Sequence, residues 1–497
     1  MTVQELWLLS PEIAMAGVAI AVVFADFFIS NKRTLAYISA ALLALPLLLS
    51  LNLWFGVVGD TTATSGLFGS IVADRFALFF HFMLLGITAA VIIGSVQYLE
   101  RLKEFEGEFI ALVLFSVTGM LLLVSARELV SIYVALELTA LPAAALAAFR
   151  RDSLSVEAGL KFIILSAVAS AVLLYGIVFI YGYTGTTNLE VILSRLNDLP
   201  VDSTVPFGSY GVLFAVVMIV AGFAFKMAIV PWQMWVPDVY QGSPTPVAAF
   251  LSTASKASAF AVVIRIMYTS FGSFDLQQDW SGLFAILAVV TMVFGNLLAL
   301  AQTNIKRLLG YSTIAHAGYM LVGVAAVAAN TSSGSTIAGP QGTMYYLAGY
   351  AFTNLAVFFA IIAIANRTGS NEIASLNGLS KRSPLLAVML TVGVISLLGI
   401  PPTVGFMSKA VVFSAAVNSG LLWLAVVGVV NTVVSAFYYL RIIRAIYFEE
   451  PEDDSRITAD ATVLLVTGVA VFGVALFGAI PWLILRLAEE SLQLLLT

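Results

Sequence analysis

The sequence of 497 residues contains no cysteine and only two histidines, His81 and His316. The absence of cysteine excludes disulfides, thiolate-bound iron–sulfur clusters and cysteine nucleophiles. Two histidines can ligate one haem from both sides, but these lie far apart in the chain and no second pair accompanies them. We therefore expect the chain itself to hold no redox cofactor and no metal.

Charged residues are also scarce. They make up 10% of the chain, against about 25% in soluble domains, whereas hydrophobic residues make up 61%. This composition excludes a soluble catalytic domain and predicts an integral membrane protein embedded in the lipid bilayer. The 23 Lys and Arg and 28 Asp and Glu give a net charge of −5, which argues against a nucleic-acid partner. The sequence also lacks the G-x-x-x-x-G-K-[ST] and G-x-G-x-x-G motifs, so we expect no nucleotide bound to this chain.

Long charge-free runs, separated by glycine, proline or charged clusters, predict an all-α polytopic membrane protein of about fourteen transmembrane helices. The connecting loops are too short to form a separate domain, and the longest lie near residues 188–209 and 449–460. The predicted spans are residues 13–30, 34–55, 76–98, 109–126, 129–149, 158–183, 211–236, 245–269, 281–303, 307–328, 343–365, 384–415, 419–447 and 461–487.

Basic residues gather in the odd-numbered loops between these spans. Fifteen Lys and Arg residues lie in odd-numbered loops. Five basic residues, among them Arg265, are assigned to even-numbered loops and the C-terminus, and three lysines are assigned to spans. Because loops rich in Lys and Arg stay on the cytoplasmic side, the pattern predicts that the odd-numbered loops are cytoplasmic. Both termini are then expected on the outer, positive side of the membrane.

Four charged residues stand out because they lie deep inside predicted spans, too far from the ends to reach the interface: Glu137, Lys226, Lys256 and Lys409. A charge at the centre of a membrane helix costs about 2.5–3.5 kcal/mol, so each one needs a partner or a hydrated cavity. We predict that they form a proton relay, because desolvation favours a neutral lysine and a nearby carboxylate favours the charged form. Two alternatives remain. Glu137 forms a static ion pair with one lysine, or the lysines hold an anion in a solute transporter.

Prolines interrupt two of the lysine-bearing spans. Pro231 and Pro237 follow Lys226, and residues 399–405, GIPPTVG, precede Lys409. Each proline removes a backbone donor and breaks the local hydrogen-bond ladder. Paired broken helices in the two halves of a membrane protein are typical of an ion site at a repeat interface, where freed carbonyls face a wet cavity. An inert proline kink is the alternative at either position alone.

Other polar residues are further candidates. Glu157 and Lys161 stand four residues apart at the start of the sixth span and predict an interfacial ion pair or a point of proton uptake. His316, in the tenth span, is suited to pass a proton between the lysines because histidine titrates near neutrality; a hydrogen-bonded packing role is the alternative. His81 is expected at the membrane interface. Three asparagines inside spans are expected to join helices through hydrogen bonds: Asn296, Asn354 and Asn431.

The residues around Lys226 and Lys256 resemble a known family. Residues 225–246, FKMAIVPWQMWVPDVYQGSPTP, and 249–256, AFLSTASK, are similar to the seventh-to-eighth-helix signature of the antiporter-like membrane subunits of proton-pumping NADH:quinone oxidoreductase, respiratory complex I. Among those subunits the chain is most similar to the subunit N family. Supporting similarities cover both halves of the chain, at residues 9–12, 131–138, 157–162, 306–318, 399–409 and 431–441.

The resemblance implies a domain organisation and roles for the buried charges. It implies two inverted five-helix repeats with discontinuous helices 7 and 12. By residue, it implies that Glu137 is the ion-pair partner of Lys226, Lys256 the middle relay and Lys409 the terminal proton site. The implied units are an N-terminal three-helix segment (1–105), a first repeat with helices 4–8 (106–270), a second repeat with helices 9–13 (280–448) and a C-terminal helix (460–497).

The resemblance also implies a function and partners. The chain would translocate protons in the membrane arm, driven by quinone reduction in partner subunits of the membrane and peripheral arms. Quinone, FMN and iron–sulfur clusters would belong to those partners, and the complex would lie in a bacterial inner membrane or another energy-transducing membrane. A subunit of a multi-subunit monovalent cation/proton antiporter is the alternative. A purely structural subunit would tolerate the loss of its buried lysines.

One residue departs from the family pattern. Many members have histidine where this chain has Gln233, seven residues after Lys226 and two turns along an unbroken helix. Glutamine hydrogen-bonds water but does not take up a proton at physiological pH. A titrating relay step at this position is therefore not expected.

Overall fold

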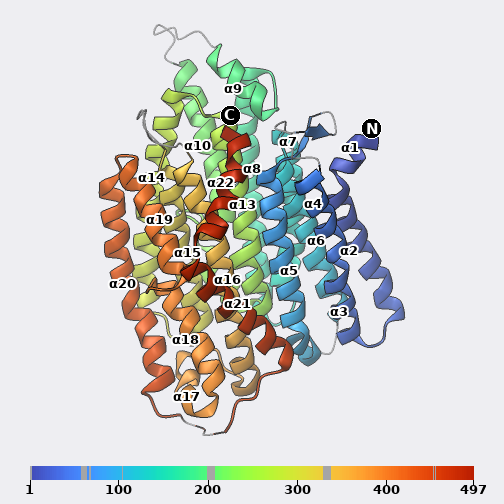
Figure 1. The fold of residues 1–497 in the computed structure, drawn as a ribbon, viewed down its shortest axis with the longest axis vertical. Helices are drawn as coiled ribbons and strands as arrows, with labels where there is room; N and C mark the ends of the chain where they lie inside the picture. Colours follow the sequence, from blue (N-terminus) through green and yellow to red (C-terminus); the bar gives the residue numbers. More distant parts are fainter. Residues whose placement is uncertain are drawn as a thin grey trace.

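The structure, a computed structural model, describes residues 3–56, 64–66, 69–102, 105–198, 207–327, 337–451, 453 and 455–496. Most elements are helices that run along the long axis of the molecule (Figure 1). The predicted all-α polytopic class is confirmed, with one short antiparallel hairpin, β1 (Thr64–Gly66) and β2 (Ile71–Ala73), as an addition. Lys103, one of the basic loop residues, lies outside the described residues.

Within the described residues, 13 helical spans are long and apolar enough to cross a membrane. Two shorter apolar helices, α18 (Pro384–Leu398) and α19 (Val404–Asn418), together fill the twelfth predicted span, so the structure agrees with the prediction of fourteen. The other helices are α1 (Val3–Leu8), α2 (Ser10–Phe28), α3 (Lys32–Leu42), α4 (Ala44–Gly56), α5 (Arg75–Leu102), α6 (Glu106–Ser125), α7 (Leu129–Ala147), α8 (Ser153–Thr184), α9 (Leu189–Asn197), α10 (Phe207–Met227), α11 (Trp235–Gly242), α12 (Thr245–Phe250), α13 (Lys256–Ser270), α14 (Phe274–Leu300), α15 (Ile305–Ala325), α16 (Ala338–Thr368), α17 (Leu379–Arg382), α20 (Leu422–Tyr447), α21 (Ala461–Ala479) and α22 (Trp482–Leu496).

Both predicted helix breaks are present. The seventh span stops at Met227 and resumes at α11, and Ala228, three residues before Pro231, has a left-handed φ of 63°. The twelfth span stops at α18, because Gly399 turns with a φ of 89° and two prolines without backbone donors follow it. Each break leaves helix-end carbonyls without their usual partners inside the protein.

Three features differ from the sequence-based expectation. The fourteenth span was expected to be continuous, but it divides into α21 and α22 at Pro481, which cannot donate to the helix ladder. The expected loop after Asn188 contains helix α9, which Asn188 caps through its side chain. The eighth span contains a π-helical turn, η1 (Leu251–Ser255), directly before Lys256. Such turns are rare and often occur at functional sites.

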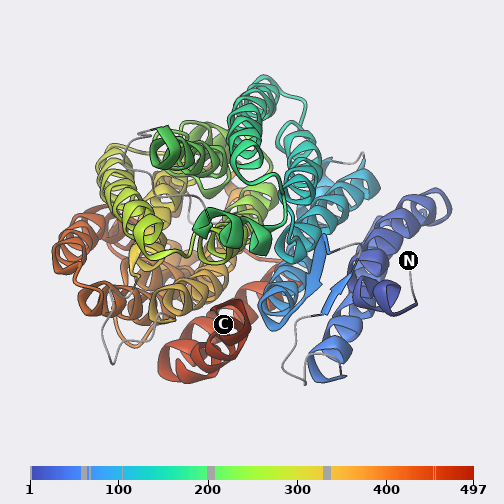
Figure 2. The same cartoon turned by 90° about the horizontal axis from the view of Figure 1, so that it is seen from above.

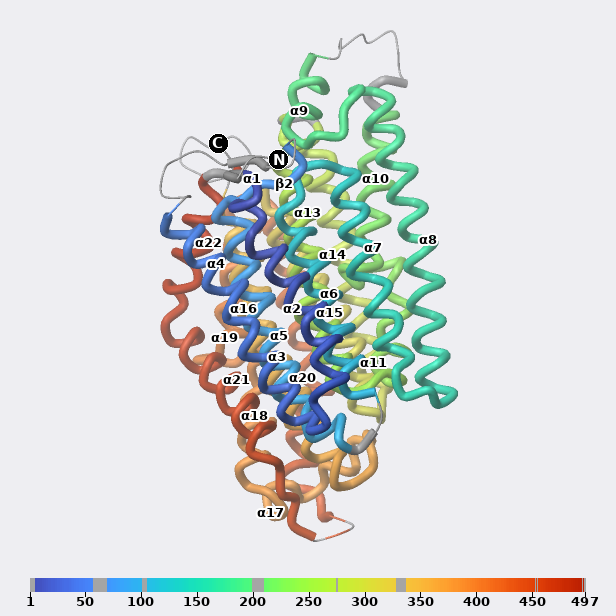
Figure 3. Tube along the Cα trace, turned by 90° about the vertical axis from the view of Figure 1, so that its right-hand side faces the viewer, coloured from blue at the N-terminus to red at the C-terminus, as the bar shows by residue number. Residues whose placement is uncertain are grey.

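The odd-numbered loops lie together at one end of the molecule. Arg33, at the start of α3, forms an ion pair with Glu100 near the end of α5, and its guanidinium lies 3.9 Å from Asp460 before α21. At the same end, the Asn304 amide donates to Glu372 at 3.2 Å. The even-numbered loops meet at the opposite end, together with both chain termini (Figure 3). This separation matches the charge pattern of the sequence.

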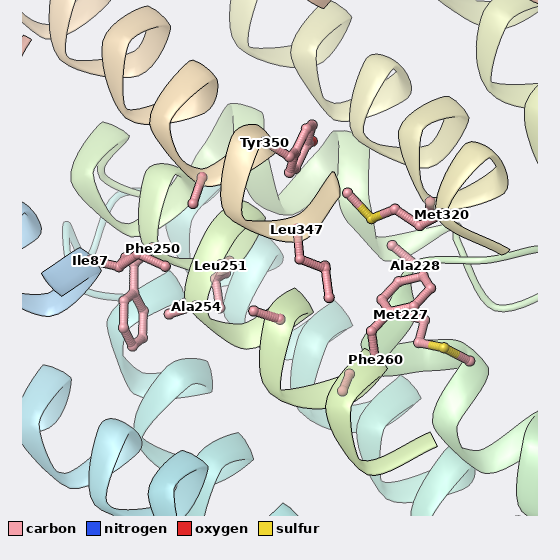
Figure 4. Packing of buried hydrophobic residues seen from close by; sticks show 14 of the residues in the cluster. Ile87, Met227, Ala228, Phe250, Leu251, Ala254, Phe260, Met320, Leu347 and Tyr350 are labelled. Carbon is pink, nitrogen blue, oxygen red and sulfur yellow. The ribbon is translucent and has the colours of Figure 1, made fainter. Parts of the chain in front are cut away.

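The N-terminal helices form a separate side of the body. Seen from above, α2, α3 and α4 stand at one edge and pack against α5 and α6 (Figure 2). The centre is formed by α12, η1, α13, α15 and α16, whose side chains are almost entirely buried. Phe250, Leu251, Leu347 and Met320 belong to the buried hydrophobic cluster there (Figure 4). Lys256, on α13, and His316, on α15, therefore lie in the least exposed part of the molecule.

Candidate functional site

Lys256 lies at the centre of the molecule. It is the first residue of α13, follows the π-helical turn, and is only 1% exposed. Its Nζ donates to the backbone carbonyl of Thr313 on α15 at 2.6 Å and lies 5.5 Å from the centroid of the Tyr350 ring. The lysine thus bridges the eighth and tenth spans without a carboxylate partner among the described residues.

His316 lies beside this lysine on α15. Its Nδ1 is 2.8 Å from the hydroxyl of Tyr346, and its Nε2 is 3.2 Å from the hydroxyl of Tyr439. The Tyr439 hydroxyl also contacts Ser312 one turn earlier on α15. Because hydroxyl and imidazole groups both donate and accept, this arrangement can pass a proton as well as hold the helices together. Both Lys256 and Lys409 act electrostatically on the imidazole.

Lys409 fills the break in the twelfth span. It is 4% exposed, and its Nζ donates to the carbonyls of Leu397 and Leu398 at 3.2 and 2.9 Å. These carbonyls end α18 and have no continuing helix to bond them. An ammonium group is favourable at a helix C-terminus because it complements the helix dipole. The broken helix and the lysine are therefore parts of one site.

Gly399 leaves the space that the Lys409 side chain occupies. A Cβ on this glycine would lie 3.1 Å from the lysine Cδ, and the φ of 89° is strained for other residues. We expect Gly399→Ala to destabilise the chain by about 1–3 kcal/mol and to displace Lys409, lowering proton translocation severalfold. Gly420 is the matched control, because it also has a positive φ, of 80°, but has open space around it. Both variants should have a lower midpoint of thermal unfolding, but only Gly399→Ala should have lower proton translocation. Equal proton translocation by the two variants would contradict this role of Gly399.

Lys226 is the least satisfied of the three lysines. It lies in the last turn of α10, is 4% exposed, and its Nζ has no hydrogen-bond partner among the described residues. The ring of Phe162 is 5.5 Å away. A buried donor without a partner carries the full cost of desolvation. The burial of the Lys226 ammonium therefore depends on the electrostatic interactions that neighbouring groups supply.

Glu137 is placed differently from the sequence-based expectation. It is half-buried rather than buried, and it accepts a short hydrogen bond from Ser170 on α8. Among the described residues it makes no hydrogen bond with Lys226, although its charge acts on that lysine through space. The static ion pair is therefore wrong as a direct contact, because α7 turns the carboxylate toward α8 and the surface of the chain.

The pair of Glu157 and Lys161 is confirmed as an ion pair near the start of α8. Lys161 Nζ lies 2.6 Å from Glu157 and also 2.6 Å from Asp238 on α11. Arg307 NH1 approaches the same Asp238 at 2.5 Å. Sequence reasoning missed Asp238, although it lies inside the 225–246 signature. This carboxylate fixes the broken seventh span to α8 and α15.

Gln233 lies within the break itself. Residues 228–234 are not helical, so the estimate of two turns between Lys226 and Gln233 does not apply. The side chain is 3% exposed, and its Oε1 has no hydrogen-bond partner among the described residues. The amide oxygen is thus a buried acceptor in the break that follows Lys226 along the chain.

The asparagines behave as predicted at two positions of three. Asn296 on α14 donates to Asn431 on α20 at 3.3 Å and to the hydroxyl of Tyr319 at 3.2 Å. The Tyr438 hydroxyl donates to the Asn296 Oδ1 at 2.9 Å. The side-chain NH₂ of Asn354 instead donates to a carbonyl of its own helix, α16. The expected hydrogen bond from this group to another helix is therefore wrong.

Two further expectations are wrong because tertiary packing buries the side chains. His81 is 1% exposed rather than interfacial, because α4 and α6 cover it. Arg265, assigned above to a loop, lies inside α13 and is 3% exposed. Its guanidinium forms a bidentate ion pair with the Asp74 carboxylate, with N···O distances of 2.7 and 2.9 Å.

Comparisons with known proteins agree with this arrangement. Residues 126–435 match a family described as NADH:quinone oxidoreductase/Mrp antiporter, TM. A relative from Dehalococcoides mccartyi, named NADH-quinone oxidoreductase subunit N, is 40% identical over 491 residues, which cover 98% of this chain and 99% of the relative.

Two solved structures are similar over nearly the whole chain. One is a chain of respiratory complex I from Thermus thermophilus with bound aureothin, with a TM-score of 0.77, 30% identity and coverage of 96% and 99% of the two chains. The other belongs to the Mrp complex of Dietzia sp. DQ12-45-1b, with a TM-score of 0.85, 22% identity and full coverage of both chains at 100%. At that identity the second likeness concerns the fold alone.

The fold and the family match define the class of protein. The chain belongs to the NADH:quinone oxidoreductase/Mrp antiporter family of transmembrane proteins. Within it, the predicted resemblance to the subunit N family is confirmed by the near-full-length relative.

Proposed function

We propose that the chain is a proton-translocating subunit in the membrane arm of an NADH:quinone oxidoreductase. The observation that carries this proposal is the placement of three buried lysines at helix irregularities: Lys226 before the first break, Lys256 after the π-helical turn and Lys409 in the second break. A helix irregularity frees backbone groups and space for water in a place that is otherwise apolar. Three such sites in one protein support a path for ions across it.

The relay begins at Glu137. Quinone reduction in partner subunits shifts this half-buried carboxylate relative to Lys226, which changes the proton affinity of the lysine. A proton then passes to Lys256 and, with His316 as an intermediate, to Lys409. The hydroxyls at 2.8 and 3.2 Å from the His316 ring nitrogens support this role, because each can donate or accept.

The energy for transport comes from outside the chain. Moving one charge against 100 mV costs about 2.3 kcal/mol, and the sequence has no phosphate-binding motif for ATP. Quinone, FMN and iron–sulfur clusters belong to the partner subunits of the membrane and peripheral arms. The half-buried carboxylate of Glu137, which α7 turns toward the surface of the chain, supports contact with such a partner.

The helices are organised as two inverted five-helix repeats, 106–270 and 280–448, after an N-terminal segment of residues 1–105 and before a C-terminal segment of residues 460–497. The matching breaks between α10 and α11 and between α18 and α19 support this division. The protein lies in a bacterial inner membrane or another energy-transducing membrane. The end that carries the basic loops faces the cytoplasm, and both termini face the outer, positive side.

The proposal is tested by mass spectrometry of the complex that co-purifies, in mild detergent, with a tag on this chain. We expect recovery of subunits that carry iron–sulfur clusters and a quinone site. Recovery of small membrane subunits alone, together with Na⁺-dependent proton transport in vesicles, would instead support the monovalent cation/proton antiporter. The family match, whose description names the Mrp antiporter beside the oxidoreductase, is the observation that keeps this second candidate in the test.

A further inference from the structure

A second set of titratable side chains lies outside the lysine sites, where the N-terminal helices meet α6. Glu12 is on α2, His81 on α5 and Ser125 at the end of α6. The Ser125 Oγ donates to Glu12 Oε1 at 2.7 Å and lies 3.1 Å from His81 Nε2. The direct distance from His81 Nε2 to Glu12 Oε1 is 3.5 Å. On its other side, His81 Nδ1 lies 3.3 Å from the Ser50 Oγ of α4.

These groups are buried, and one of their polar atoms is unsatisfied. Glu12 is 4% exposed and His81 1%. Glu12 Oε2 is buried and has no hydrogen-bond partner among the described residues. An isolated carboxylate is costly in such a place, and so is an isolated imidazolium. The low-energy states are therefore a neutral acid beside a neutral imidazole, or an ion pair, and these two states differ by the position of one proton.

Ser125 provides the route for that proton. In the ion-pair state His81 carries a proton on both ring nitrogens, and its Nε2 passes one to the Ser125 Oγ while the serine hydroxyl passes its own proton to the Glu12 carboxylate at Oε1. One N–H and one O–H bond break, two O–H bonds form, and the serine is regenerated with its original composition. The distances of 3.1 and 2.7 Å are those of hydrogen bonds, so the transfer needs no movement of the helices.

The surrounding charges are few and come from three directions. Asp74, just before α5, and Arg265, on α13, both act electrostatically on His81. Asp74 and Arg265 are bonded to each other, and Arg127, just after the end of α6, interacts electrostatically with both. Arg265 stands nine residues after Lys256 on the same helix. Binding of a proton to the Glu12–His81 pair thus changes the net charge beside the anchor of the helix that carries the central lysine.

We propose that Glu12 and His81, bridged by Ser125, form a second proton-binding site of this chain, which holds one exchangeable proton in the N-terminal three-helix segment. The site does not rest on the lysine relay, since it stands on its own hydrogen bonds. The protonation of this site responds to the pH at the end of the molecule that carries the even-numbered loops, because the N-terminus of α2 and the C-terminus of α6 both lie at that end.

The test is infrared difference spectroscopy of the whole complex in nanodiscs, recorded between acidic and neutral pH. We expect a band of a protonated buried carboxyl group that is lost in Glu12→Gln and shifted in His81→Gln and Ser125→Ala. Glu108→Gln is the matched control, because Glu108 is an exposed carboxylate on α6, and it should keep the band. Lys409→Ala should also keep it, so failure of the relay and failure of this site are distinguishable.

Two outcomes would overturn the proposal. The first is a difference spectrum of Glu12→Gln that equals that of the unmodified complex. The second is a carboxyl band that is insensitive to pH, because the proton would then not be exchangeable. If Glu12→Gln does not assemble, His81→Gln decides the question, and an unshifted band in that variant rejects the pair.

Discussion

Replacing Lys409 with alanine should abolish proton translocation and lower coupled quinone reduction by about tenfold, which corresponds to ~1.4 kcal/mol of added barrier. The ammonium of Lys409 is bound to the carbonyls of Leu397 and Leu398 that the break in α18 leaves free. Without it, the proposed path loses its terminal proton site and two buried acceptors lose their donor. The measurement is proton uptake and quinone reduction by the purified complex in vesicles.

Two variants separate the proton-carrying role from a structural one. Lys409→Arg keeps a positive charge and donors for the same carbonyls, but arginine does not release its proton. A relay predicts that this variant also fails, whereas a helix cap predicts that it works. Lys381→Ala removes an exposed lysine of α17 and should be normal. Normal proton translocation by an assembled Lys409→Ala complex would remove Lys409 from the path.

Replacing Asp74 with alanine should have the largest effect on stability. The carboxylate makes two bonds to Arg265, and both side chains are almost completely buried. Removing one partner of a buried ion pair leaves an uncompensated charge and costs about 3–5 kcal/mol. We expect a marked loss of the chain from assembled complex and a lower midpoint of thermal unfolding.

A double variant tests whether the charge itself causes this loss. Asp74→Leu combined with Arg265→Met replaces the pair with apolar side chains, and we expect it to be less damaging than Asp74→Ala alone. Arg486→Ala removes an exposed arginine, 80% exposed at its side chain, and is the control for loss of a charge. If the double variant is no more stable than Asp74→Ala, packing rather than charge explains the effect.

The lysines of the candidate site could be predicted because the membrane makes charge costly. Lys226, Lys256 and Lys409 each interrupt a long apolar run, so the sequence alone shows them as charges inside membrane spans. Their partners could not be predicted in the same way. The acceptors of Lys256 and Lys409 are backbone carbonyls, which every residue possesses. Only the crossing of α13 with α15, and the turn at Gly399, decides which carbonyls these are.

Residues with polar side chains near span ends were the most difficult to place. His81 and Arg265 stand where a sequence pattern indicates the interface, yet both are buried. Their burial results from helices that are distant in the sequence: α4 and α6 cover His81, and Asp74 reaches Arg265 across 191 positions. Glu137 shows the opposite case, because a charge expected inside the protein lies half-exposed on its side.

The sequence by itself determined the membrane class, the number of spans, the two proline breaks and the burial of Lys226, Lys256 and Lys409. Each of these follows from composition or from local backbone chemistry, which act along the chain. The tertiary structure alone decided the π-helical turn before Lys256, the contacts of His316 and the pairing of Glu12 with His81. Such features depend on which helices pack side by side, and the hydrophobic pattern that drives helix insertion carries no information about those neighbours.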